Sequence, residues 1–177
     1  MLRRKVESFQ LDEPEAALPF TARLAREQGW TLGFAGQVTE EYKRFVILAM
    51  AAGHPVTPSE AVDQVWHLHL VYTRSYWQDW CGQVLGAELH HGPTRGGGEE
   101  QAKFTDWYAA TLESYRRIFE EEPPPAIWPD PVTRFTGAGA GRWVDGWTHW
   151  IVPRPGWTRR SWWAAKFKRT SKTKSIS

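Results

Sequence analysis

The chain has 177 residues, a formal net charge of +2 and a single cysteine. This length suits one domain of ordinary size that buries a hydrophobic core. Aromatic residues make up 14% of the chain, with 12 tryptophans, which favours packed structure over disorder. A single cysteine excludes an internal disulfide and suits a reducing compartment. No apolar run of about 18 residues occurs, so we expect a cytoplasmic protein without a signal peptide or transmembrane segment.

Charge is distributed unevenly along the sequence. Residues 151–177 contain eight of the 22 basic residues and no acidic residue. The remaining residues, 1–150, therefore hold 14 bases against 20 acids, a net charge of −6. An acidic body followed by a basic tail indicates two regions with different partners.

Two helices are predicted before residue 53. The first covers residues 12–30 and ends at Gly29 and Gly33. The second covers residues 38–52, where apolar side chains recur at helical spacing. The residues of the second helix interpreted as core are Val38, Tyr42, Phe45, Leu48, Ala49 and Ala52, and those expected on its solvated face are Lys43 and Arg44.

The clearest start of a helix lies at Thr57. Thr57 can act as the N-cap, Pro58 suits the first helical position, and Glu60 would close a capping box. Nothing breaks a helix from there to about Tyr72. We therefore predict a helix over residues 57–72 and expect it to be the central helix of the domain.

A helical wheel divides the polar residues of this segment. Asp63 and His67 are four residues apart and therefore neighbours on one strip. His67 and His69 are about 200° apart, so they cannot bind one ion while the segment is α-helical. His69 falls on the apolar face with Val62, Val65 and Trp66, and we interpret it as a buried, hydrogen-bonded histidine.

The same wheel suggests a metal site. Asp63 and His67 would bind as a pair, joined by His91 or His90 from the later loop, with Cys81 as a further candidate. Zinc accepts His, Asp and Cys ligands, and a structural zinc site commonly uses four. The alternative is a site without an ion, in which the Asp63 carboxylate orients the His67 ring.

Short motifs between about residues 15 and 135 form a recognisable set. They are Tyr42-Lys43-Arg44-Phe45, Pro58-Ser59, Val62 to Leu70, Tyr76-Trp77, Leu85-Gly86 and Leu89-His90-His91. Together they resemble the glycine-rich-domain-containing protein family, which includes plant stress-related proteins and bacterial members. The resemblance implies a helical domain and no established reaction. This chain has Ala61 and Gly92-Pro93 where plant members carry acidic residues, which removes two potential carboxylate ligands.

Two more helices are predicted beyond residue 72. Residues 74–84 would bury Tyr76, Trp77, Trp80 and Val84, and we expect Trp66 and Tyr76 to be buried or adjacent to the metal ligands. A glycine-rich loop follows at residues 92–99. Residues 99–121 sustain an apolar i, i+3, i+4 pattern, which Pro123-Pro124-Pro125 ends. Ile127 and Trp128 are then expected to plug an apolar groove of the bundle.

The last part of the chain differs in character. Residues 136–155 comprise a Gly-rich hinge and a short aromatic β or irregular extension. Residues 156–177 form a Trp-rich basic tail, whose candidate contacts for an anionic membrane surface or nucleic acid are Arg159, Arg160, Trp162, Trp163, Lys166 and Lys168. The alternative is a tail whose tryptophans pack back on the acidic body.

The sequence thus predicts a mainly α fold, with a bundle of about five helices over residues 1–135. We expect a binding or scaffold domain with an unidentified protein partner and a structural His/Asp cluster that a zinc ion could stabilise. The alternative is a metal-dependent hydrolase using Asp63, His67 and His91 as ligands. That reaction needs an open coordination position and a general base, for which Asp79 and Glu88 are candidates.

Overall fold

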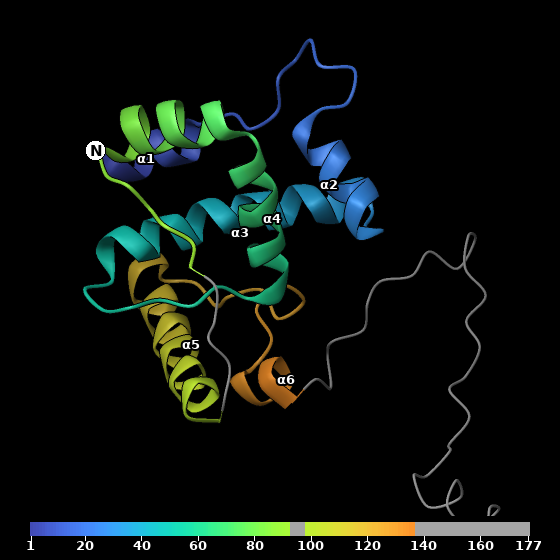
Figure 1. Cartoon of the computed structure of the whole chain (residues 1–177). Coiled ribbons are helices and arrows are strands. Elements are labelled where there is room, and N and C mark those ends of the chain that lie inside the picture. Colours follow the sequence, from blue (N-terminus) through green and yellow to red (C-terminus); the bar gives the residue numbers. More distant parts are fainter. Residues whose placement is uncertain (93–97, 137–177) are drawn as a thin grey trace, which may run out of the picture. The chain divides into compact units, whose positions relative to one another are not determined.

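The computed structural model describes residues 1–92 and 98–136 (Figure 1). The described residues form six α-helices and one π-helix and contain no strand, which confirms the mainly α prediction. The predicted hinge, the β segment and the basic tail lie outside the described residues, apart from Thr136. The elements in chain order are α1 (Leu2–Ser8), α2 (Phe20–Gln28), α3 (Leu32–Ala51), α4 (Glu60–Val71), the π-helix η1 (Ser75–Leu85), α5 (Gly98–Phe119) and α6 (Pro131–Thr136).

The N-terminal helices differ from the predicted ones. Helix α2 is shorter than predicted, and α1 was not predicted at all. Gly29 ends α2 as expected, because its φ of 68° is a left-handed conformation that glycine adopts readily. Gly33, however, lies inside α3, whose start is set by Thr31: its side chain accepts a hydrogen bond from the backbone N–H of Phe34.

Helix α3 is the central helix of the domain. It packs against α1, α2, α4 and α5, and it runs across the middle of Figure 1. Its buried side chains point in several directions, because they include almost every residue from Val38 to Leu48. The expectation that the helix beginning near Thr57 is central is therefore wrong, since α4 packs mainly on α3 and η1.

Lys43 is buried because helix α1, which was not predicted, packs beside it. Its side chain was expected in solvent, but Lys43 is only 4% exposed. The ammonium group donates to the backbone carbonyl of Glu7 at 3.3 Å and pairs with Glu40 at 2.9 Å. Because α1 packs on α3, it covers the alkyl chain of Lys43 while these acceptors satisfy its charge.

Ile127 and Trp128 are buried, as predicted. The indole of Trp128 donates to the carboxylate of Glu41 on α3 at 2.9 Å, and the Tyr115 hydroxyl donates to the same carboxylate at 3.2 Å. Burial raises the pKa of Glu41, and these two hydrogen bonds act against that rise. The segment after α5 is thus attached to α3 through a buried polar group.

The N-cap of helix α4 lies two residues later than predicted. Its N-cap is Ser59, whose side chain accepts from the backbone N–H of Val62 at 3.2 Å. The backbone N–H of Thr57 instead donates to the hydroxyl of Thr111 on α5 at 3.0 Å. This contact between distant residues holds Thr57 outside the helix, and the predicted capping box does not form.

The fourth predicted helix has a different register from the expected one. As a π-helix with i→i+5 hydrogen bonding, η1 buries Tyr76, Trp80, Cys81 and Leu85. Trp77 was expected in the core but is 40% exposed, because the wider turn rotates it off the buried face. Leu85 takes the buried place that the α-helical spacing assigned to Val84.

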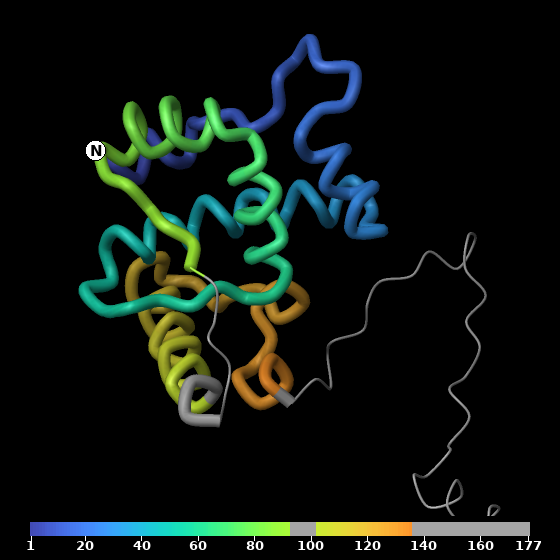
Figure 2. Tube along the Cα trace, viewed as in Figure 1, coloured from blue at the N-terminus to red at the C-terminus, as the bar shows by residue number. Residues whose placement is uncertain are grey.

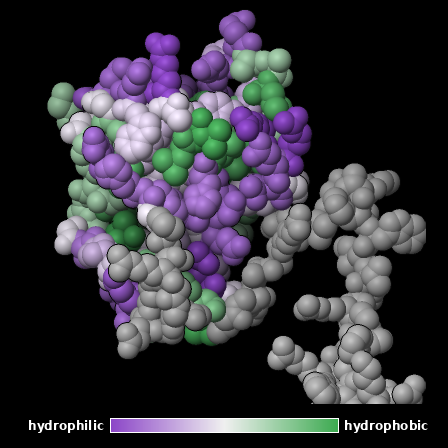
Figure 3. Space-filling view, viewed as in Figure 1, coloured by the Kyte–Doolittle hydropathy of each residue, from purple (hydrophilic) through white to green (hydrophobic). Residues whose placement is uncertain are grey.

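Polar side chains cover much of the face shown in Figure 3, with apolar patches between them. The large apolar residues that remain exposed in the described part come from separate elements and loops. No helix in that part has the length and apolar character needed to cross a bilayer.

The two candidate caps of α4 can be separated by mutation. Ser59→Ala should lower the free energy of unfolding by about 1 kcal/mol, because the backbone N–H of Val62 loses its acceptor. Thr57→Val should be close to neutral, since the buried Thr57 hydroxyl has no hydrogen-bond partner. Urea denaturation measures both. A larger loss in the Thr57 variant than in the Ser59 variant would contradict this assignment of the cap.

Candidate metal centre

Helix α4 places its polar residues on opposite sides, as the wheel predicted. The His67 side chain is 52% exposed, whereas His69 is fully buried. Asp63 lies one turn before His67 on the outer strip, and its carboxylate oxygen is 3.6 Å from the Nε2 atom of His67. The helix therefore presents one carboxylate and one imidazole side by side at the surface.

The third member of the group comes from the loop after η1. Gly86 ends η1 with a φ of 67°, and the backbone N–H of Ala87 bonds to the carbonyl of Cys81 at 3.2 Å. The chain then turns away from η1 and runs back toward the middle of the domain (Figure 2). This return brings His91 against α4.

Three ligand atoms converge where the loop meets α4. The Nε2 atom of His91 lies 2.7 Å from a carboxylate oxygen of Asp63 and 3.1 Å from the Nε2 atom of His67. Two nitrogens bound to a tetrahedral zinc ion at about 2.05 Å would be roughly 3.3 Å apart. The three side chains offer ligand atoms within 4.8 Å of one another. They could hold a single ion once the hydrogen-bonded contact of His91 with Asp63, at 2.7 Å, widens to a similar spacing of about 3.3 Å. The predicted approach of His67 and His91 is confirmed.

Trp66 and Tyr76 lie beside this group, as predicted. The rings of Trp66 and His91 have centroids 4.5 Å apart in an edge-to-face arrangement. The indole N–H of Trp66 donates to the Tyr76 hydroxyl at 2.8 Å, and that hydroxyl donates to the carbonyl of Leu89. Burial raises the pKa of Tyr76 to about 12, so its hydroxyl remains a donor at neutral pH.

The other candidate ligands are placed elsewhere. The ring of His90 points away from the group and pairs with the carboxylate of Glu88 at 3.0 Å, where both side chains are exposed. Cys81 is buried on the inner face of η1. Asp79, the other candidate general base, accepts a hydrogen bond from Gln83 on the same helix. None of these residues belongs to the group that could hold an ion.

His69 has the buried role that the wheel predicted. Its Nδ1 atom lies 3.0 Å from the hydroxyl of Tyr42, and its Nε2 atom lies 3.2 Å from the hydroxyl of Ser75. Burial lowers the pKa of His69 from 6.5 to about 3, so the ring is neutral at physiological pH. The sequence did not identify Tyr42 or Ser75 as its partners, because these contacts join three separate elements.

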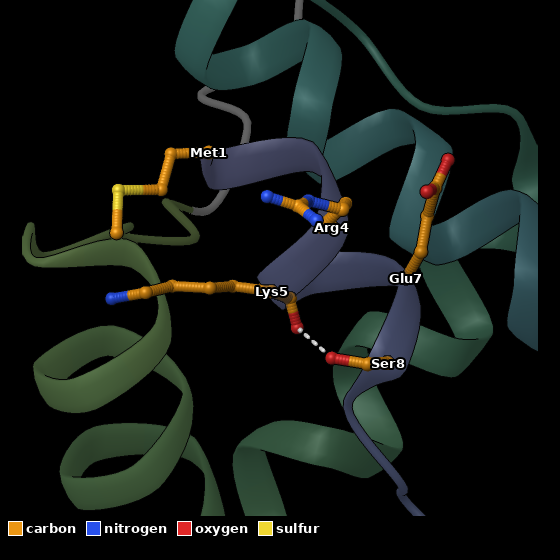
Figure 4. A pocket seen from close by; sticks show the side chains of 5 residues that line it. All are labelled: Met1, Arg4, Lys5, Glu7 and Ser8. Atoms are coloured by element: carbon orange, nitrogen blue, oxygen red, sulfur yellow. Dashed lines mark hydrogen bonds between the residues drawn. The ribbon is translucent and has the colours of Figure 1, made fainter.

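The cavity shown in Figure 4 lies on α1 and not at the His/Asp group. Its lining residues are Met1, Arg4, Lys5, Glu7 and Ser8. The hydroxyl of Ser8 donates to the backbone carbonyl of Lys5, and all five residues are exposed. An open hollow lined by solvated side chains does not assemble a set of ligands or reacting groups, and we assign it no chemistry.

Comparison with known proteins adds one finding. A family model described as UCP032817-like matches residues 21–106. This range includes α2 from its second residue, the whole of α3, α4 and η1, and all three members of the His/Asp group. Its description assigns no function. No curated protein matches the chain. No solved structure matches it either.

The buried His69 should make stability depend on pH. Its lowered pKa means that the unfolded chain binds a proton between pH 6.5 and about 3 while the folded chain does not. The stability associated with the neutral ring is therefore fully present above pH 6.5 and is lost as pH falls. Between pH 7 and pH 5, this group should lower the free energy of unfolding by about 2 kcal/mol.

His69→Gln provides the comparison for this effect, because glutamine retains a donor and an acceptor but does not titrate. Urea denaturation of both proteins at several pH values isolates the contribution of His69 as the difference between the two curves. Parallel curves from pH 7 to pH 5 would mean that folding leaves the pKa of this histidine unchanged.

Proposed function

We propose that this protein is a helical binding or scaffold domain whose surface His/Asp cluster holds a zinc ion in a structural role. The observation that carries the proposal is the convergence of Asp63, His67 and His91 on one point, with ligand atoms at most 4.8 Å apart. An ion there would attach the loop that contains His91 to α4. His67 and His91 are 24 residues apart in the sequence. The ion would supply electrostatic attraction between these segments.

The donor set favours zinc among the common divalent ions. Two imidazole nitrogens and one carboxylate oxygen match the ligands that zinc accepts, whereas magnesium and calcium prefer all-oxygen sites. The Asp63 and His91 side chains are 24% and 19% exposed, so an ion would be partly shielded on their side. The more exposed His67 would form the outer edge of the site.

The histidine doublet provides a matched test. Equilibrium dialysis followed by elemental analysis should find about one zinc ion per chain in the wild-type protein. His91→Ala should weaken zinc binding by at least about 100-fold, since it removes a ligand. His90→Ala should leave binding unchanged, because the neighbouring His90 pairs with Glu88 outside the site.

Stability gives a second readout of the same site. Free zinc at about 100 times its dissociation constant should raise the free energy of unfolding by about 2.7 kcal/mol in the wild type and in His90→Ala. His91→Ala should not respond to zinc at that concentration. Wild-type protein that binds no zinc would show that the cluster is held by hydrogen bonds alone.

A metal-dependent hydrolase is the second candidate, favoured by the exposure of His67. Three protein ligands leave a fourth position of a tetrahedral zinc for water, and the half-exposed His67 would let solvent reach it. The nominated general bases, Asp79 and Glu88, are hydrogen-bonded to Gln83 and His90 and do not belong to the group that could hold an ion.

An activity assay distinguishes the two candidates. Zinc-loaded protein should hydrolyse neither a p-nitrophenyl ester nor a p-nitrophenyl phosphate faster than buffer containing the same zinc. Metal-dependent turnover that His67→Ala abolishes and His90→Ala retains would instead establish the hydrolase.

Two further expectations stay predictions. The motifs that resemble the glycine-rich-domain-containing family all lie inside the region that the UCP032817-like model matches, but that match does not test the resemblance. The binding of an anionic membrane surface or nucleic acid by the basic tail concerns residues 156–177, which lie outside the described part. Both are compatible with a binding or scaffold domain.

A further inference from the structure

A chain of hydrogen bonds connects the core to the loop that carries His91. The hydroxyl of Tyr76, on η1, accepts a hydrogen bond from the Trp66 indole and donates one to the carbonyl of Leu89. Leu89 precedes His91 by two residues, and Trp66 precedes His67 by one. A single hydroxyl therefore joins the helix that carries two of the cluster residues to the loop that carries the third.

The same hydroxyl also fixes the surface on which the His91 ring lies. Tyr76 is fully buried and Trp66 is only 6% exposed, so the indole has little freedom to rotate once its N–H is bonded. The His91 ring packs against this indole with centroids 4.5 Å apart. Its Nε2 atom then faces Asp63 and His67, at 2.7 and 3.1 Å.

Without the Tyr76 hydroxyl, both of its partners would lose a hydrogen bond inside the protein. Leu89 is partly buried, and its carbonyl oxygen would need water or a shifted backbone to find another hydrogen-bond donor. The loop would then sample positions in which the His91 nitrogen no longer meets Asp63 and His67. Since binding an ion requires all three ligands together, every such position lowers the affinity.

We propose that Tyr76 is the positioning residue of the metal site: through Trp66 and Leu89 it holds the His91 ring toward Asp63 and His67 before an ion binds. The effect on metal affinity rests on the proposed zinc function, whereas the position of the His91 ring does not. The test therefore measures both quantities separately.

Tyr76→Phe removes only the hydroxyl. Tyr108→Phe is the matched control, because the Tyr108 hydroxyl also donates to a backbone carbonyl, that of Pro129, between α5 and α6. Titration with cobalt(II), whose visible spectrum reports its coordination, measures affinity and geometry. Nuclear Overhauser contacts between the rings of His91 and Trp66 in the metal-free protein measure the position of the ring.

The Tyr76 variant should bind cobalt 10- to 100-fold more weakly than the wild type and lose the ring contacts. Tyr108→Phe should keep both, even if its melting temperature falls. A Tyr76 variant with wild-type affinity, or with intact ring contacts, would overturn the inference. Should the wild type bind no cobalt, the zinc proposal fails, and the ring contacts alone decide whether Tyr76 positions His91.

Trp66→Phe serves as the second variant if Tyr76→Phe does not fold. It removes the indole N–H but keeps an aromatic ring in the core. Weaker cobalt binding, with loss of contacts between His91 and the ring at position 66, would support the proposal that Tyr76 positions His91 through Trp66. Unchanged values for both would refute it.

Discussion

The helical backbone of α4 is the constraint on which both histidine environments depend. At about 100° per residue, it sends His67 outward and His69 inward, although only one residue separates them. The inward ring is neutral and bonded to Tyr42 and Ser75, and the outward ring joins Asp63 and His91. One helix thus serves the core and the surface cluster at once, and a change of its register would destroy both.

The cluster could be predicted from the sequence only in part. Asp63 and His67 follow from helical spacing, but the spacing does not determine which residue of the later doublet joins them. In the structure the two rings have different partners: His91 meets Asp63 and His67, whereas His90 pairs with Glu88. The turn at Gly86 is local, but the contact of Tyr76 with Leu89, on which the proposed positioning of His91 depends, is a tertiary contact.

The helix boundaries were missed for a related reason. Ser59 and Thr57 are both good caps by residue type, and a hydrogen bond to Thr111, 54 residues away, removes Thr57 from the helix. The sequence pattern assigns Lys43 to the surface, but in the structure α1 covers it and accepts a hydrogen bond from its ammonium group. The π-helical register of η1 likewise differs from the α-helical spacing that sequence patterns assume, so Trp77 was assigned to the core. Local patterns predicted five of the seven described helices, all except α1 and α6, and distant contacts fixed where several of them begin and what they bury.

The same helical geometry shows which sequence departures matter for the site. Ala61 stands where plant members of the family that the motifs resemble carry an acidic residue. Because α4 is already helical at this position, residue 61 lies about 200° from Asp63, the same separation that divides His67 from His69. A carboxylate at position 61 could not share an ion with Asp63 without unwinding the helix. The expectation that Ala61 removes a potential ligand is therefore corrected by the helical geometry of α4, and Asp63 remains the carboxylate that α4 contributes to the cluster.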